Sequence, residues 1–153
     1  GTRVPLIVSW PGKVKAGSVT DALHQSIDFF PTFVDMLGWE MSSGHSFDGV
    51  SMKSTLEKNQ AVRDEIFCHF PHHNPCTSLR KGDWKLIRWY FDQPDGSHRY
   101  ELYNLAKDEG EENNLAMQET KRVEELSGRM DELLLETEAL IPLPNPDYVA
   151  DRQ

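Results

Sequence analysis

The chain has 153 residues, of which 38% are hydrophobic and 10% aromatic, so it can form a domain with a core and is not intrinsically disordered. No apolar run approaches the roughly 20 residues that cross a bilayer, so we expect no membrane partner. The net charge of −9 arises within residues 101–153, which hold 14 acidic and 5 basic side chains, whereas residues 1–100 hold 11 of each. Such an acidic surface does not favour nucleic acid as a partner.

The first predicted element is the apolar run Val4–Trp10, which is typical of a strand buried on both faces of a parallel sheet. Pro11 and Gly12 end it in a turn. Such a strand needs neighbouring strands, so we expect sheet-forming sequence upstream of Gly1 in a longer protein. Where those strands are missing, an exposed edge invites pairing, and we expect a homo-oligomer or strand exchange through residues 1–40.

An apolar stripe with helical spacing follows between Asp21 and Gly38. We expect the main helix to begin near Asp28, with Pro31 in its first turn and Gly38 as its stop. A loop comes next, and Ser51–Glu57 is predicted as a short turn-like or helical piece.

Beyond Asp64 the pattern changes to short runs rich in β-branched and aromatic residues. Strands are predicted at Glu65–Phe70, Thr77–Arg80, Trp84–Phe91 and His98–Leu105. The second and third are joined by Lys81-Gly82-Asp83, which is a tight hairpin signal.

Thr120–Glu138 is an amphipathic helix with one apolar stripe, and Ile141–Asp147 is a proline-rich extended tail. The fold class predicted from these elements is α+β. Residues 1–60 read as a strand and helix from an α/β sheet. Residues 61–140 read as a small antiparallel sheet of about four strands packed on a carboxy-terminal helix, and residues 141–153 form the tail.

One loop is dense in histidine: His69, His72 and His73 occur in the run C-H-F-P-H-H-N-P. Imidazoles can hydrogen-bond sugar hydroxyls or sulfate at neutral pH, so these three residues are predicted to bind substrate. An ordinary solvated loop is the alternative. A shared metal is not favoured, because adjacent side chains of an extended segment point to opposite sides.

Two further groups of side chains allow both a structural and a binding interpretation. Aromatic residues on the predicted hairpins read better as core than as a carbohydrate-stacking platform; they are Trp84, Trp89, Tyr90, Tyr100 and Tyr103. Hairpin cations read better as solvated charges than as an attractor of sulfated glycans; they are Arg80, Lys81 and Lys85.

The two cysteines, Cys68 and Cys76, do not form a C-x-x-C pair, so a zinc site is not favoured. One disulfide across a short loop and two separate thiols both remain open, and cysteine usage does not fix the compartment.

Five sequence motifs occur in a fixed order. They are R-V-P-L-I-V-S-W-P-G at residues 3–12, S-I-D-F-F-P-T at 26–32, D-G-V-S at 48–51, R-K-G-D-W-K-L-I at 80–87, and E-L-Y-N-L at 101–105 followed by Asp108, Glu111 and Asn114. Each motif alone is weak, but the ordered set over about residues 3–140 resembles the carboxy-terminal part of the sulfatases, a branch of the alkaline-phosphatase superfamily.

The resemblance implies a large α/β catalytic domain followed by a small four-stranded domain, with a calcium ion and a formylglycine that attacks sulfate esters. It implies that the nucleophile and the metal ligands precede Arg3, so we expect no catalytic or metal-binding residue in this chain and no activity of the chain alone. Residues 76–80 superficially resemble the formylglycine motif, but Ser78 replaces its proline or alanine and the segment aligns with the hairpin.

For the intact enzyme the resemblance implies a sulfated small molecule or glycan as substrate and a periplasmic, secreted or lysosomal location. It also places the loop with His69, His72 and His73 near the mouth of the catalytic cleft. Two alternatives remain: a non-catalytic binding or oligomerisation module, and a phosphodiester or phosphonate hydrolase of the same superfamily. A sulfate-release assay distinguishes them.

Overall fold

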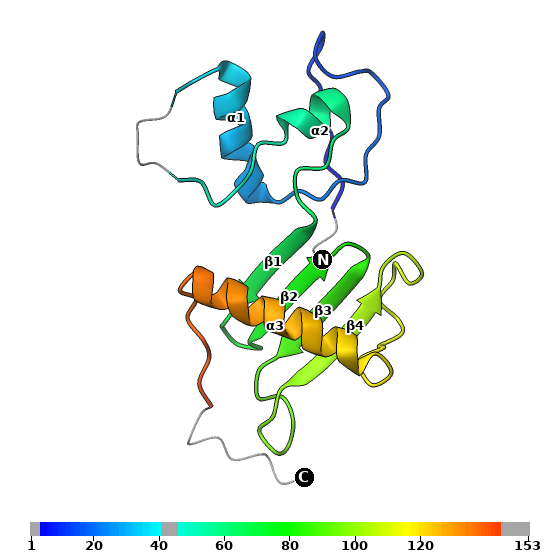
Figure 1. Cartoon of the computed structure of the whole chain (residues 1–153), viewed down its shortest axis with the longest axis vertical. Helices are drawn as coiled ribbons and strands as arrows, with labels where there is room; N and C mark the ends of the chain where they lie inside the picture. Colours follow the sequence, from blue (N-terminus) through cyan, green and yellow to red (C-terminus); the bar gives the residue numbers. More distant parts are fainter. Residues whose placement is uncertain (1–3, 41–45, 145–153) are drawn as a thin grey trace. The chain divides into compact units, whose positions relative to one another are not determined.

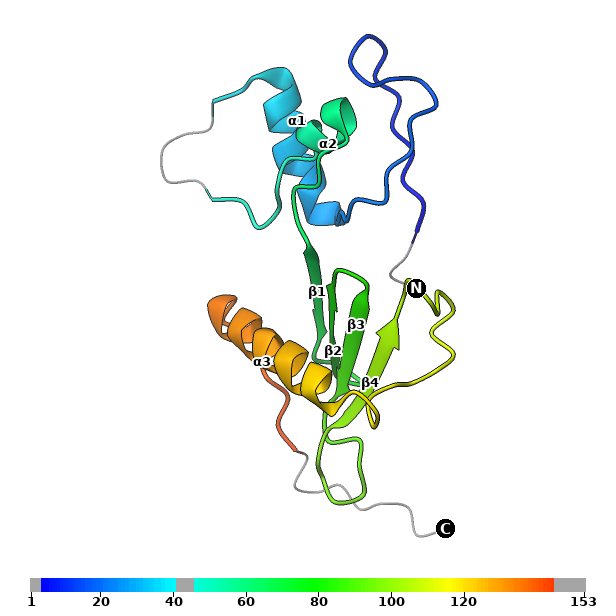
Figure 2. The same cartoon turned by 45° about the vertical axis from the view of Figure 1, so that its right-hand side comes forward.

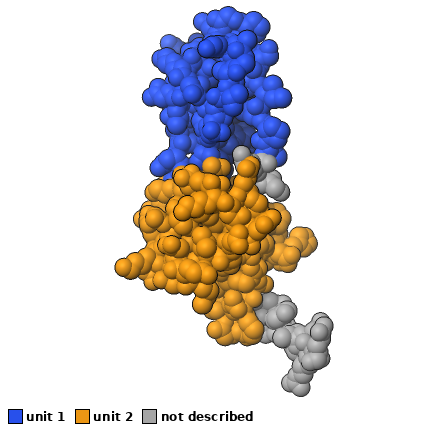
Figure 3. All heavy atoms as spheres, turned by 90° about the vertical axis from the view of Figure 1, so that its right-hand side faces the viewer, with its two compact units in different colours: residues 1–66 blue, residues 67–153 orange. Residues whose placement is uncertain are grey.

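The computed structural model describes residues 4–40 and 46–144 of the chain. The chain divides into two compact units, residues 1–66 (unit 1) and residues 67–153 (unit 2), which Figure 3 shows in blue and orange. Among the described residues, no helix is long and apolar enough to cross a membrane.

Unit 1 contains a 3-10 turn and two helices, which are η1 (Ser26–Asp28), α1 (Phe29–Leu37) and α2 (Lys53–Lys58). Pro31 occupies the first turn of α1, where its missing N–H costs nothing. Gly38 ends the helix with a φ of 63°, a left-handed conformation that glycine adopts without strain. The predicted start, first-turn proline and stop of this helix are confirmed.

The strand predicted at Val4–Trp10 is wrong, because these residues form no strand in the structure. A strand needs a neighbour for its backbone hydrogen bonds, and the four strands among the described residues all belong to a single sheet elsewhere in the chain. Val4 and Ile7 are consequently 77% and 91% exposed. The expected turn does follow, since the N–H of Val14 donates to the carbonyl of Trp10 at 2.9 Å.

A buried carboxylate organises unit 1. Asp28 is fully buried and accepts hydrogen bonds from the backbone N–H of Gln25 at 2.8 Å and of Val50 at 2.9 Å. The guanidinium of Arg63 donates to the same carboxylate and forms an ion pair with it. One side chain thereby joins the start of the helical segment, the loop before α2 and the end of the unit.

A second contact joins the same two segments. The Thr32 hydroxyl donates to the carbonyl of Asp28 at 2.5 Å and accepts from the N–H of Met52 at 2.9 Å. A Cβ at Gly49 would lie 2.1 Å from the carbonyl oxygen of Ile27, so only glycine fits there. The motifs S-I-D-F-F-P-T and D-G-V-S are therefore joined by the hydrogen bonds of Asp28 and Thr32, a set of contacts that we call the polar clasp.

The sheet has four strands in the order β1-β2-β3-β4 (Figure 1). Its hairpin register places Leu79 opposite Leu86, and Leu86 opposite Leu102. The β2–β3 turn contains Gly82, whose φ of 55° is left-handed. All four predicted strands are confirmed, with the bounds Glu65–Phe70, Cys76–Lys81, Trp84–Trp89 and Arg99–Asn104.

Helix α3 (Thr120–Glu136) crosses one face of this sheet, as Figure 2 shows. Alternation along the strands turns one leucine of each of β2, β3 and β4 toward the helix. The resulting core consists of Leu79, Leu86, Leu102, Leu126 and Met130, each at most 2% exposed. The α+β class and the packing of the sheet on a carboxy-terminal helix are confirmed.

Candidate functional site

Both ring nitrogens of His69, on β1, are bonded within the protein. Its Nδ1 lies 2.8 Å from the Thr77 hydroxyl, its Nε2 lies 2.9 Å from the carbonyl oxygen of Leu140, and the Thr77 hydroxyl lies 2.8 Å from that of Tyr90. A carbonyl only accepts, so Nε2 carries the proton and, in the neutral ring, Nδ1 accepts from Thr77. The Thr77 hydroxyl must then accept from the Tyr90 hydroxyl, so the donor of each of the three hydrogen bonds is defined.

This series of hydrogen bonds has a structural consequence. Thr77 is fully buried and Tyr90 is 5% exposed, so their hydroxyls depend on each other and on His69. The bonds join β1, β2 and the end of β3 to the segment that follows α3. A direct role of His69 in substrate binding stays a prediction, and it would require one of these bonds to break.

His72 and His73 lie in the loop between β1 and β2, and both are exposed. The ring of His72 meets the ring of Phe70 edge-on, with centroids 6.1 Å apart, and His73 has a left-handed φ of 54°. The structure thus separates the three predicted site residues into one inward histidine and two outward ones. Binding of substrate by His72 and His73 also stays a prediction.

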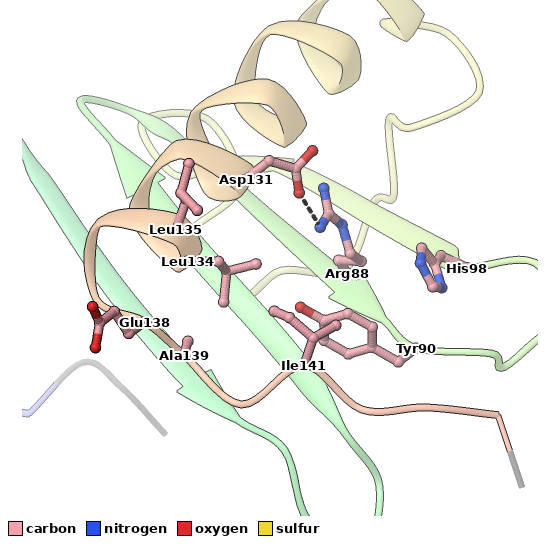
Figure 4. Close-up of a pocket in the computed structure, with 9 residues that line it drawn as sticks. All are labelled: Arg88, Tyr90, His98, Asp131, Leu134, Leu135, Glu138, Ala139 and Ile141. Carbon is pink, nitrogen blue, oxygen red and sulfur yellow. Dashed lines mark hydrogen bonds and ion pairs between the residues drawn. The ribbon is translucent and has the colours of Figure 1, made fainter.

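A groove of about 550 Å³ lies beside the buried hydrogen bonds, between the sheet, α3 and the segment that follows it (Figure 4). Arg88, on its floor, is 5% exposed and donates to Asp131 at 2.6 Å and to the Ser127 hydroxyl at 2.5 Å. One feature of the sequence could have indicated this groove. Arg88 is a charged residue on the core-facing side of β3, two residues after the buried Leu86. The lining residues are Arg88, Tyr90, His98, Asp131, Leu134, Leu135, Glu138, Ala139 and Ile141.

His98, at one end of the groove, has a defined tautomer. The backbone N–H of Phe91 donates to its Nδ1 at 3.2 Å, so the proton of the neutral ring resides on Nε2. Burial lowers the pKa of His98, the positive charge of Arg88 lowers it further, and Asp131 offsets part of this effect. The ring is also enclosed by aromatic neighbours, with centroids 5.2 Å from Tyr90 and 4.9 Å from Phe91. At neutral pH this side chain is an uncharged donor.

The aromatic side chains of the hairpins are structural, as predicted. Tyr90 and Tyr103 are buried, at 5% and 8% exposure. The other three rings are half-buried and each is covered by a guanidinium at 5.1 to 5.8 Å from its centroid. The pairs are Arg88 with Tyr100, Arg99 with Trp89, and Arg122 with Trp84. A sugar would have to displace these cations in order to stack.

Two of the predicted hairpin cations are also engaged within the protein. The ammonium of Lys85 donates to both carboxylate oxygens of Glu111, at 2.6 and 2.7 Å. The guanidinium of Arg80 donates to the carbonyl of Gly82 at 3.1 Å. Arg80 is bonded within the motif at residues 80–87, and Lys85 joins this motif to Glu111. These contacts support the interpretation of both cations as structural.

The described residues do not fit the metal and the modified residue that the family resemblance implies. Within residues 4–40 and 46–144, no group of three or more His, Cys, Asp or Glu side chains could hold a metal ion, whereas calcium takes six to eight oxygen ligands. The structure forms no disulfide between Cys68 and Cys76. Burial, together with Cys68 and Glu101, raises the pKa of the Cys76 thiol.

Sequence comparison finds sulfatases among the relatives of this chain. The family model described as N-sulphoglucosamine sulphohydrolase, C-terminal, matches residues 1–139. A sulfatase of Formosa agariphila is 36% identical over 129 residues, which cover 75% of this chain and 23% of that protein. An N-acetylglucosamine-6-O-sulfatase of Bacteroides thetaiotaomicron is 32% identical over 123 residues, which cover 74% of this chain and 21% of that protein.

Structural comparison agrees. A solved structure of a protein in complex with its substrate, D-glucosamine-2-N,6-O-disulfate, superposes with a TM-score of 0.74 at 29% identity, covering 89% of this chain and 29% of that one. This chain spans about a quarter of the length of the relatives that it matches. The sulfatase resemblance carried by the ordered motifs is confirmed: the chain belongs to the N-sulphoglucosamine sulphohydrolase C-terminal family and is the carboxy-terminal portion of a sulfatase.

Proposed function

We propose that the intact protein is a sulfuric ester hydrolase acting on sulfated amino sugars, and that the 153-residue chain alone does not hydrolyse them. The observation that carries the proposal is the family match over residues 1–139, together with a structural relative that holds a glucosamine disulfate as substrate. The named activity of the Bacteroides relative, on N-acetylglucosamine, supports the same class of sugar.

The division of labour within the intact protein follows from the residues of this chain. Calcium and formylglycine would supply the electrophilic and nucleophilic chemistry, and the described residues contain no group of three or more side chains that could hold a metal ion. This chain would instead supply a rigid sheet–helix unit and its histidine loop. In that loop His72 and His73 are exposed to a ligand, while His69 holds the first strand to Thr77 and Leu140.

The proposed reaction is tested by measuring inorganic sulfate released from N-acetylglucosamine 6-sulfate and from D-glucosamine-2-N,6-O-disulfate. We expect release by the intact protein and none by the 153-residue chain, whose fold is checked by circular dichroism. An intact protein that releases no sulfate from either sugar would overturn the substrate class. Release by the 153-residue chain would overturn its inactivity.

The role of the loop is tested with His72→Ala in the intact protein. Loss of one polar contact to the bound sugar should raise KM and leave kcat nearly unchanged. Exposed Met117, 87% accessible and in a different loop, provides a control as Met117→Ala. Equal KM values for His72→Ala and the unaltered protein would remove His72 from the binding site.

A second function, oligomerisation through residues 1–40, is favoured by one observation. Unit 1 exposes large apolar side chains that monomeric proteins bury; they include Ile7, Phe30, Phe33, Leu37 and Trp39. We propose that the 153-residue chain self-associates through this surface, whereas the intact protein covers it. Light scattering at micromolar concentration tests this idea, and a strictly monomeric 153-residue chain would contradict it. The alternative of a phosphodiester or phosphonate hydrolase is not favoured by the two sequence relatives described above, which are named as sulfatases.

A further inference from the structure

The groove of Figure 4 combines an apolar wall with a small number of polar groups. Leu134 and Leu135 of α3 form the wall, together with Ala139 and Ile141 of the following segment. The ring of Tyr90 lies on the sheet side and is buried, at 5% exposure. The volume of about 550 Å³ lies within the range of small-molecule sites and suits one or two sugar rings.

The polar groups of the groove comprise one donor and several acceptors. His98 Nε2 carries a proton, because its Nδ1 accepts from Phe91, and no hydrogen bond from Nε2 is found among the described residues. The rim carries the carboxylates of Asp131 and Glu138, and the side chain of Asp131 is 63% exposed. One N–H donor beside carboxylate acceptors matches a ligand that is rich in hydroxyl or amide N–H groups.

The charge of the groove argues against an anionic ligand. The guanidinium of Arg88 is 5% exposed, is paired with Asp131 and is bonded to Ser127, and its one nitrogen without a partner, Nε, is buried away from the groove surface. Glu138 adds a negative charge at the rim, while His98 is neutral by its tautomer. A sulfate group entering here would therefore meet a carboxylate and no available cation.

We propose that this groove binds an uncharged amino-sugar residue of the glycan, with its ring and acetamido methyl against the exposed side chains of Leu135 and Ile141. The proposal rests on the proposed function, because the glycan is the substrate class assigned there. It deepens that function by assigning a position to an unsulfated sugar. The amide and hydroxyl hydrogens would donate to Asp131 and Glu138, and His98 would donate to a ring or carbonyl oxygen.

The hydrogen bonds already described hold the outer wall of the groove in place. His69 donates to the carbonyl of Leu140, which lies between Ala139 and Ile141. This bond fixes the segment that supplies the outer wall of the groove. The groove is thus preformed by three strands and the helix, which lowers the cost of ordering it around a weakly bound sugar.

Binding is tested by titrating the isotope-labelled 153-residue chain with uncharged N,N′-diacetylchitobiose and, separately, with N-acetylglucosamine 6-sulfate. We expect millimolar binding of the uncharged sugar, shifts centred on the His98 ring and on the amides of Leu135 and Ile141, and little dependence on salt. Ala139→Trp should fill the groove and weaken binding by about tenfold or more. Glu132→Gln, on an exposed part of α3 outside the groove, should leave the affinity unchanged.

Three results would overturn the proposal: no shifts with the uncharged sugar, tighter binding of the sulfated sugar, or shifts unaffected by Ala139→Trp. Occupation by residues 145–153 is tested with a chain that ends at Pro144. Equal affinity of both chains supports a sugar site, whereas binding by the shortened chain only would make the tail the occupant. No assay here measures sulfate release, so a failure of the proposed reaction and a failure of this groove remain distinguishable.

Discussion

Units 1 and 2 differ in the balance of apolar and polar side chains that they bury. Unit 2 buries leucines and a methionine between its sheet and α3, whereas Phe33 and Leu37 of α1 in unit 1 are 55% and 58% exposed. The deeply buried groups of unit 1 include Asp28 and Thr32, which are polar. Because apolar burial is the main driving force of folding, we expect unit 2 to be stable by itself and unit 1 to depend on its polar clasp.

The largest effect is expected from Asp28→Ala. This change removes the acceptor of three hydrogen bonds and leaves the guanidinium of Arg63 without its buried partner. Breaking a buried ion pair typically costs about 3–5 kcal/mol, which should unfold unit 1 and leave unit 2 intact. Amide signals in NMR spectra, followed unit by unit, measure the outcome.

The matched control for that change is Asp35→Ala. Asp35 pairs with Lys53 at 2.8 Å, but its side chain is 45% exposed. Exposed pairs contribute below about 1 kcal/mol, so unit 1 should keep its spectrum. If Asp28→Ala and Asp35→Ala had similar effects, the polar clasp would not be what holds unit 1.

The next effect contrasts the two units directly. Leu86→Ala removes a fully buried side chain of unit 2 and should lower its free energy of unfolding by about 2–5 kcal/mol. Phe33→Ala removes a larger ring from α1, but that ring is 55% exposed and should change stability little in the 153-residue chain. Urea unfolding of both variants makes the comparison. A larger loss for Phe33→Ala would show that apolar contacts stabilise unit 1 more than they stabilise unit 2.

Local patterns predicted the sheet and helices well, because those elements follow from residues close in sequence. Alternating apolar positions set β1 to β4, and Pro31 with Gly38 set the ends of α1. The strand prediction for Val4–Trp10 was wrong for a different reason. An apolar run becomes a buried strand only beside neighbouring strands, and the sheet among the described residues contains only β1 to β4.

The side-chain networks were not predictable in the same way. Asp28 was recognised as part of a motif, but its partner Arg63 lies 35 positions away and no local pattern joins them. Arg88 likewise meets Asp131 at a separation of 43. His72 and His73 were correctly located in a loop between two strands, whereas His69 lies on β1 and is bonded to Thr77 and Leu140.

The stability of each unit should depend on pH through one buried histidine. Burial lowers the pKa of His24 in unit 1 and of His98 in unit 2 below 6.5. Below pH 6.5 these two histidines bind protons more readily in the unfolded chain than in the folded one. The free energy of unfolding of each unit should therefore decrease as the pH falls from 6.5 to the lower pKa that its histidine has in the folded state. His98→Gln should flatten this dependence in unit 2 only, and His24→Gln in unit 1 only.

The measurement is urea unfolding followed above and below pH 6.5 with amide signals of each unit. Asp108 does not interfere, because backbone hydrogen bonds lower its pKa from 3.8 and its contribution is lost only in stronger acid. A decline that persists in both variants would mean that the two buried histidines do not set the sensitivity of the units to acid.

The smallest effect, from Tyr90→Phe, separates the two kinds of stabilisation within unit 2 itself. The change keeps the ring in the core and removes only the donor to Thr77, so the Thr77 hydroxyl keeps its bond to His69 but accepts no hydrogen bond from Tyr90. One such bond contributes about 1 kcal/mol, well below the loss from Leu86→Ala. Thr77 would then be able to rotate, and the His69 ring, held to Leu140 at its other nitrogen, should broaden in NMR spectra. A loss as large as that of the leucine variant would mean that unit 2 resembles unit 1, with buried polar bonds contributing as much stability as its apolar core.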